Sequence, residues 1–163
     1  QAIDAEPEDY FTAFSNHLMC NQVLARAVIK DMKNAGWGRI INIISTSVKT
    51  PLKGLGVSNT IRGAVASWAK TLSLELAPFG ITVNNVLPGF TMTARLESII
   101  NTRAQKEGKT FDQIKGEMLN EIPAGRIGEA EEVAAAVAFL ASPAAGYING
   151  INIPVDGGKT PSL

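Results

Sequence analysis

The sequence predicts an α/β protein whose parallel sheet is covered by helices on both faces. Several segments carry apolar residues with the 3.6-residue period of a helix, and short continuous runs rich in Ile and Val lie between them, as in buried strands. Strands that alternate with helices pair in parallel, because each helix returns the chain to the starting end of the sheet. Gly and Pro residues mark where these segments end.

The first two elements are expected to be a long helix and a strand. The helix spans residues 7–33: Pro7 suits a first helical turn, and acidic residues flank it where the helix dipole is positive. Gly36 follows the last periodic residue and predicts the end of this helix. The run at 39–44 reads Arg-Ile-Ile-Asn-Ile-Ile and predicts a strand that is buried on both faces.

The rest of the chain continues this alternation. The expected order is a loop at 45–58, a helix at 59–77, a strand at 81–87, a charged and loosely patterned helical segment at 92–121, an Ala-rich helix at 130–141 and a strand within 149–155. Gly80 predicts the end of the second helix, and Thr110 with Gln113 predicts a capping box. Ligands of such sheets bind at the carboxyl ends of the strands. Those ends are residues 45–47, 88–93 and 156–158.

Composition excludes several classes of function. The 163 residues suffice for one domain with a core, and 15 basic residues balance 15 acidic ones, so no electrostatic footprint for nucleic acid or an anionic membrane is present. One Cys and one His predict neither an internal disulfide nor a metal site. The longest apolar run, at 133–141, is too short to span a bilayer. We therefore expect a cytoplasmic protein. The chain begins with Gln1, which indicates a processed start or a piece of a longer protein.

Four sequence blocks together resemble the short-chain dehydrogenase/reductase (SDR) family, and in particular its 3-oxoacyl-[acyl-carrier-protein] reductases. They stand in the family's order and spacing: Gly-Arg-Ile-Ile-Asn-Ile-Ile-Ser at 38–45, Gly-Ile-Thr-Val-Asn-Asn-Val-Leu-Pro-Gly at 80–89, the segments 126–133 and 139–142, and the segment 147–158 with its terminal Val-Asp-Gly-Gly. The resemblance implies a Rossmann-like, doubly wound parallel sheet. Residues 1–163 would be the C-terminal part of a single such domain, holding its last three strands and their helices.

The family reduces a carbonyl, or oxidises an alcohol, with a Tyr as proton donor, a Lys four residues later, a Ser that binds the substrate oxygen and an Asn that holds a water. Carried over by position, Ser45 matches the Ser, and Asn16 matches the Asn within one residue. The Tyr position falls on Ser58 and the Lys position on Arg62. His17, beside Asn16, is interpreted as a partly exposed packing residue rather than a catalyst.

Ser58 and Arg62 do not replace the usual pair in its chemistry. A serine hydroxyl is far less acidic than a phenol, and Arg62 stays charged at any relevant pH. Arg62 retains the capacity to bind ribose hydroxyls or to stabilise a developing negative charge. The sequence therefore predicts an atypical SDR that lacks the Tyr-x-x-x-Lys motif.

The resemblance also implies NAD or NADP as cofactor. Arg62, Pro88, Gly89, Thr91 and Thr93 match positions that contact it. The Gly-rich turn that binds the dinucleotide phosphates in the family is absent from the sequence, together with the first half of the fold. The strand at 39–44 is then expected to expose an unpaired edge.

The resemblance gives 92–121 as a lid over the substrate, which would be a small carbonyl compound or an acyl thioester. It pairs the helices at 7–33 and 59–77 across a homodimer or homotetramer. Three readings of function stay open: an NAD(P)-dependent reductase with a degenerate catalytic set, a catalytically silent binding or assembly subunit, and an inactive truncated fragment.

Overall fold

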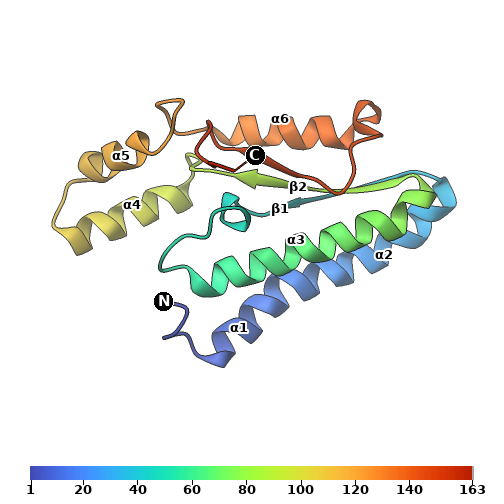
Figure 1. Cartoon of the computed structure of the whole chain (residues 1–163), viewed down its shortest axis with the longest axis horizontal. Coiled ribbons are helices and arrows are strands. Elements are labelled where there is room, and N and C mark those ends of the chain that lie inside the picture. The colour runs from blue at the N-terminus through green and yellow to red at the C-terminus, as the bar shows by residue number, and fades with distance from the viewer. Residues whose placement is uncertain (163) are drawn as a thin grey trace.

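The computed structural model describes residues 1–162, and its centre is a parallel three-stranded sheet (Figure 1). The ladder places Ile43 opposite Val86 and Pro88 opposite Val155, so the carboxyl ends of the strands meet at one end of the sheet. The predicted parallel α/β architecture is thereby confirmed. The strands follow chain order across the sheet: β1 (Gly38–Ile43), β2 (Ile81–Pro88) and β3 (Asn152–Val155).

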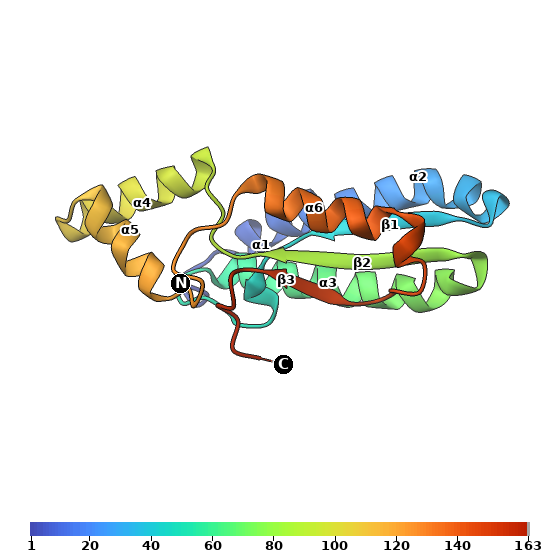
Figure 2. The same cartoon turned by 90° about the horizontal axis from the view of Figure 1, so that it is seen from above.

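Helices cover both faces of the sheet. The helices α2 (Cys20–Ala35) and α3 (Gly56–Leu76) lie on one face, and α6 (Ala130–Ala141) lies on the other (Figures 1 and 2). Side chains of the central strand β2 alternate between the two layers, as the two-residue period of a strand requires. Val83 packs with the α2 and α3 layer, whereas Val86 packs with α6. None of the helices within residues 1–162 is both long and apolar enough to cross a membrane.

The long first helix is continuous but changes geometry in the middle. It consists of α1 (Pro7–Phe14), a π-helical turn at Ser15–Met19, and α2. Gly36 ends it in the left-handed conformation, with φ of 63°, as predicted. The predicted helix is thus confirmed, and it extends two residues beyond 33. Hydrophobic periodicity does not reveal the π turn, because one wider turn shifts the apolar stripe only slightly.

Two element boundaries differ from the prediction, and side-chain hydrogen bonds explain both. α3 begins at Gly56 rather than at residue 59, because the Asn59 amide donates to the Leu52 carbonyl at 2.8 Å and fastens the first turn to the loop. The last strand begins only at residue 152. The Asn149 amide donates to the Ser73 carbonyl and accepts from the Val83 backbone N–H, so side-chain bonds hold the segment before β3.

The predicted helical segment at 92–121 forms a hairpin that projects beyond one end of the sheet (Figure 2). It contains α4 (Ala94–Glu107) and α5 (Phe111–Asn120), and Thr110 with Gln113 forms the predicted capping box. The hairpin buries an apolar cluster of its own: Leu96, Ile100, Ala104, Ile114 and Met118, joined by Ile122 and Ile127 from the following segment. It is therefore a small packed unit at the carboxyl end of β2.

The outer edge of β1 is free of any strand from residues 1–162, since the sheet order is β1, β2, β3. The Ile43 side chain, at the carboxyl end of this edge, is 60% exposed. The expected unpaired, Ile-rich edge is confirmed.

The first turn of α6 predicts a measurable dependence of stability on acid. Glu132 accepts two hydrogen bonds from the Arg126 guanidinium, at 2.7 and 2.6 Å, and one from the Glu129 backbone N–H at 2.9 Å. These bonds, the one from Arg126 foremost, lower the pKa of Glu132 to about 2. The carboxylate therefore stabilises the folded state above its unfolded pKa of about 4.3, and this contribution is lost as the pH falls through about 2.

We expect the free energy of unfolding, measured by urea denaturation, to fall less steeply with decreasing pH in Glu132→Gln than in the wild type. Because the pair is exposed, high salt will diminish the effect. Glu131→Gln, in the same turn, is the matched control, and its free energy of unfolding should change with pH as in the wild type. A wild-type slope in Glu132→Gln would contradict the assignment.

Candidate active site

Ser45 occupies the carboxyl end of β1, where the sequence predicts it. The Ile44 N–H before it donates to the Val86 carbonyl at 2.9 Å, so the sheet holds this position. The Ser45 hydroxyl accepts a hydrogen bond from the Ser47 N–H at 3.1 Å and caps the short 3₁₀ turn Thr46–Val48. The hydroxyl is thereby oriented, and its own O–H remains to be donated.

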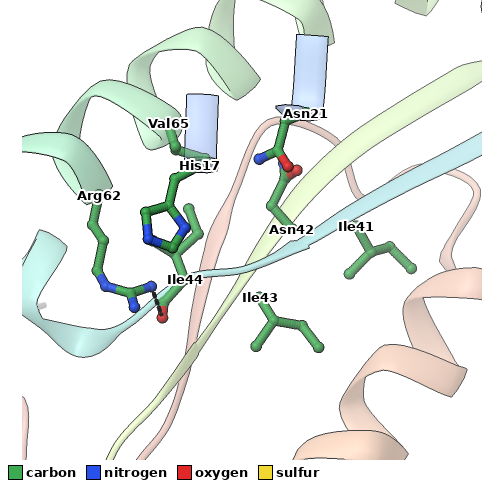
Figure 3. Close-up of a pocket in the computed structure, with 8 residues that line it drawn as sticks. All are labelled: His17, Asn21, Ile41, Asn42, Ile43, Ile44, Arg62 and Val65. Carbon is green, nitrogen blue, oxygen red and sulfur yellow. Dashed lines mark hydrogen bonds between the residues drawn. The ribbon is translucent and has the colours of Figure 1, made fainter. Parts of the chain in front are cut away.

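Ser58 and Arg62 lie one turn apart on α3 and are hydrogen-bonded to each other. The Arg62 Nε donates to the Ser58 Oγ at 3.1 Å, and Nη1 donates to the Ile44 carbonyl at 2.7 Å (Figure 3). The structure thus brings Ser58 and Arg62 together and fastens Arg62 to the backbone carbonyl one residue before Ser45. Arg62 is half-buried, and burial lowers the pKa of its guanidinium from its usual value. At neutral pH it is a fixed positive charge.

A cavity of about 180 Å³ opens beside Arg62 along the edge of β1 (Figure 3). We call it the Arg62 cavity. Its polar groups come from the long first helix, from β1 and from α3, and no carboxylate lines it. Its walls are His17, Asn21, Ile41, Asn42, Ile43, Ile44, Arg62 and Val65.

A second cavity, of about 470 Å³, lies between the N-terminal segment and the start of α3. We call it the Ser58 cavity, because Ser58 lies on its wall with two carboxylates, those of Asp4 and Asp9. His17 is the one residue that lines both cavities. The two cavities therefore share His17 as a wall residue, and the hydrogen-bonded Ser58 and Arg62 line one cavity each.

The structure places Asn16 apart from these residues. Its side chain is exposed and lines neither cavity, although it lies within the π turn. The neighbouring His17 projects into the Arg62 cavity instead (Figure 3). It is exposed and lines the walls of both cavities. His17 and Asn21 are four residues apart on one helix face, and this spacing was the available signal.

The turn after β2 contains the predicted cofactor positions. Gly89 is required there, because a Cβ at this position would lie 2.6 Å from the Asp156 Cβ. Thr91 donates to the Gly89 carbonyl at 3.4 Å, and Thr93 caps α4 by accepting from the Leu96 N–H at 3.3 Å. With Pro88 these residues form a half-exposed turn at the same end of the sheet as Ser45.

Asp156 supports this turn from β3. Partial burial by itself would raise its pKa, but hydrogen bonds from Thr160 and from the Gly158 backbone hold the pKa below its usual range. Its carboxylate accepts from the Thr160 N–H at 2.8 Å and from the Gly158 N–H at 3.0 Å. The charged carboxylate therefore fixes the chain that packs over Gly89.

These residues fit the nicotinamide end of a dinucleotide. Arg62 has N–H groups left to donate beyond its two hydrogen bonds, and the turn at 88–93 presents backbone and threonine groups at the same end of the sheet. The phosphate end has no Gly-rich turn in this sequence to receive it. The residues of this chain therefore fit the nicotinamide half of the cofactor and leave the phosphate end without a binding turn.

Comparison with known proteins agrees with the fold. A family model described as enoyl-(acyl carrier protein) reductase matches residues 1–160. The chain is 39% identical over 151 residues to the 3-oxoacyl-[acyl-carrier-protein] reductase of Haemophilus influenzae, covering 93% of the chain and 58% of that protein. It is 37% identical over 132 residues to the NADPH-dependent reductase BacG of Bacillus subtilis, covering 81% of the chain and 51% of that protein.

A solved structure is similar along the whole chain. L-sorbose reductase from Gluconobacter frateurii, complexed with NADPH and L-sorbose, superposes with a TM-score of 0.93 at 27% identity, covering 100% of this chain and 62% of that one. The chain thus spans about half the length of the curated relatives that it matches. The chain belongs to the short-chain dehydrogenase/reductase family, as a member similar to the 3-oxoacyl-[acyl-carrier-protein] reductases.

Proposed function

We propose that this chain is the catalytic, C-terminal part of an NAD(P)-dependent reductase that acts on a small carbonyl compound or acyl thioester. The observation that carries the proposal is the hydrogen-bonded pair of Ser58 and Arg62, whose guanidinium donates to the Ile44 carbonyl next to Ser45 at the carboxyl end of β1. In an open parallel sheet this is where ligands bind. The relatives named as reductases, two of them with NADPH in their names or titles, support the same reaction class.

In this proposal Ser45, Ser58 and Arg62 have separate tasks. Reduced nicotinamide supplies a hydride to the carbonyl carbon when bound. Ser45 donates a hydrogen bond from its hydroxyl to the carbonyl oxygen. The Arg62 charge stabilises this oxygen as negative charge develops on it. Ser58 holds Arg62 in place through its 3.1 Å hydrogen bond. The family resemblance gives Asn16 the role of holding a water, although its exposed side chain lines neither cavity.

The turn at 88–93 and the hairpin beyond it complete the proposed site. Arg62, Pro88, Gly89, Thr91 and Thr93 contact the nicotinamide and its ribose. The hairpin of α4 and α5 serves as the lid over the substrate, and its separate apolar core supports this, because it can move as a unit. Residues 1–163 then form one part of a single Rossmann-like domain.

The free edge of β1 receives the nucleotide-binding half in this proposal. Beside the edge a cavity of about 320 Å³ exposes apolar side chains of the long helix, among them Leu24 and Val28, to whatever pairs there. A homodimer or homotetramer forms through the outer faces of α2 and α3, where Val23 and Leu74 are exposed. The cytoplasm, where an exposed thiol such as Cys20 stays reduced, is the proposed compartment.

Ser58 also supports a second candidate, a silent subunit that binds without turnover. Its hydroxyl stands where the family's phenol is expected, and it already accepts from Arg62. A position that no longer needs an acid tolerates such a change. The third reading, an inactive fragment, differs from both because it predicts no cofactor binding.

One experiment separates these readings. The chain is co-expressed with the N-terminal, Gly-rich half of a reductase relative, and NADPH consumption is followed by absorbance with a panel of β-ketoacyl thioesters and simple ketones. We expect consumption with at least one of them. Tight NADPH binding by calorimetry without turnover would favour the silent subunit. Absence of binding and turnover would leave the inactive fragment.

A further inference from the structure

The reaction proposed above requires a proton for the new hydroxyl, and neither tyrosine is placed to give one. The Tyr10 hydroxyl donates to the Ala2 carbonyl, and Tyr147 is fully exposed after α6. Both lie outside the Arg62 and Ser58 cavities. Serine hydroxyls and guanidinium groups lose their protons far above neutral pH. The remaining side chains that line the two cavities are therefore the candidates within this chain.

We infer that His17 is this proton donor, an inference that rests on the proposed reductase function. His17 is the single histidine of the chain, and histidine is the side chain that most often serves as a general acid or base in enzymes. It is the one residue shared by the walls of both cavities. It thus shares one cavity wall with Arg62 and the other with Ser58.

The π turn explains why the imidazole projects into the cavity. Ser15–Met19 is the one π-helical turn within residues 1–162, and the Cys20 N–H closes it on the Ser15 carbonyl, five residues back. The wider turn rotates the side chains that it contains relative to a regular α-helix. Such turns concentrate at functional sites because they re-aim one or two residues at low cost. His17 lies at the middle of this one.

The charges around His17 suit proton donation to an oxyanion. In the Arg62 cavity it faces the Arg62 guanidinium from α3, which attracts the negative oxygen to the same space. In the Ser58 cavity it faces Asp4 from the N-terminal segment and Asp9 from α1. The second cavity is open to solvent along these carboxylates, so a proton has a polar route to the imidazole.

The step balances without a further reactant. The carbonyl carbon gains the hydride while the C=O π pair moves to oxygen. That oxygen takes the N–H proton of the His17 imidazolium, which gives the alcohol and a neutral imidazole. The ring then takes up one proton from bulk solvent, which is the proton that the overall reduction consumes. General acid catalysis of this kind contributes roughly 10²–10⁴ in rate.

The placement is tested first in the chain alone, without cofactor. One histidine gives one imidazole signal in a carbon-labelled NMR spectrum. We expect Arg62→Gln to displace this signal, because the two side chains face one cavity. Arg26→Gln, on α2 and outside both cavities, is the control and leaves the signal in place. An unmoved signal in Arg62→Gln would overturn the inference.

The catalytic role is tested in the co-expressed protein described above. We expect His17→Ala to lower kcat at least about a hundredfold, and free imidazole added to the buffer to restore part of it. Ser15→Ala, in the same π turn but outside both cavities, keeps the wild-type rate. Circular dichroism of each variant checks the fold. A residue with only a structural role would not respond to imidazole.

The outcomes separate the inference from the function on which it rests. Turnover in the wild type with an unchanged rate in His17→Ala overturns the role of His17 and leaves the reductase standing. A folded, slow His17→Ala variant that imidazole does not restore also overturns it. A wild type without turnover on any substrate overturns the proposed function, and the proton donor with it.

Discussion

Replacing Ser58 by Tyr and Arg62 by Lys in the same chain is expected to raise NADPH-dependent turnover by about a hundredfold in the co-expressed protein. The double substitution creates the phenol and the ammonium of the family's usual pair at positions four residues apart on α3, one turn of the helix. A phenol beside a cation is a far stronger acid than the hydroxyl of Ser58. The measurement is kcat for ketone reduction at neutral pH.

A matched variant isolates the phenol. Ser58→Phe with Arg62→Lys supplies the same ring without the hydroxyl, and we expect it to fall below the wild type. Adding His17→Ala to the Tyr and Lys variant is expected to cost less than His17→Ala alone, because two acids at one oxygen are not additive. Equal rates in the Phe and Tyr variants would show that the gain is not proton donation.

The largest effect on stability is expected from Gly80→Ala. Gly80 joins α3 to β2 with φ of 71°, and a Cβ there would lie 2.2 Å from the Gly36 carbonyl oxygen. The substitution adds a left-handed alanine, which costs about 1–2 kcal/mol, and an overpacked contact, which costs about 1–3 kcal/mol. We expect a loss of roughly 2–5 kcal/mol in the free energy of unfolding, measured by urea denaturation.

Gly36→Ala is the control, because it places an alanine in the same left-handed conformation without a steric clash. Gly36 has a similar φ of 63°, yet nothing lies within 4 Å of the Cβ that alanine would add. We expect it to lose only the cost of the left-handed residue, about 1–2 kcal/mol. Equal losses for the two variants would mean that the ends of α2 and α3 move apart freely at this contact.

Much of the fold was predictable because its signals are local. Gly36 and Gly80 end helices in the left-handed conformation that glycine permits, and the Ile-rich run before Ser45 forms the predicted strand. The expected burial of this strand on both faces is wrong, because most of its residues are half-buried and Ile43 is exposed at the free edge. The pair of Ser58 and Arg62 was predictable through family spacing. The ladder and the helix that hold these residues bring them together.

The rest of the site depends on contacts between distant segments. The Arg62 cavity is built from three elements, and no pattern within one of them indicates that His17 and Asn42 line the same space. The π turn that aims His17 adds about one residue to a single turn of a long helix. An apolar stripe tolerates that change, so only coordinates distinguish Asn16 from His17.

Because the edge of β1 is open, the stability of this fold depends on the concentration of any segment that pairs with it. A segment that pairs with β1 binds the folded chain and not the unfolded one, so each increase in its free concentration stabilises the chain. At a hundredfold excess over the dissociation constant the gain is about 2.7 kcal/mol. The melting temperature of the chain will then report how much of its complement is present, and dilution alone will lower it.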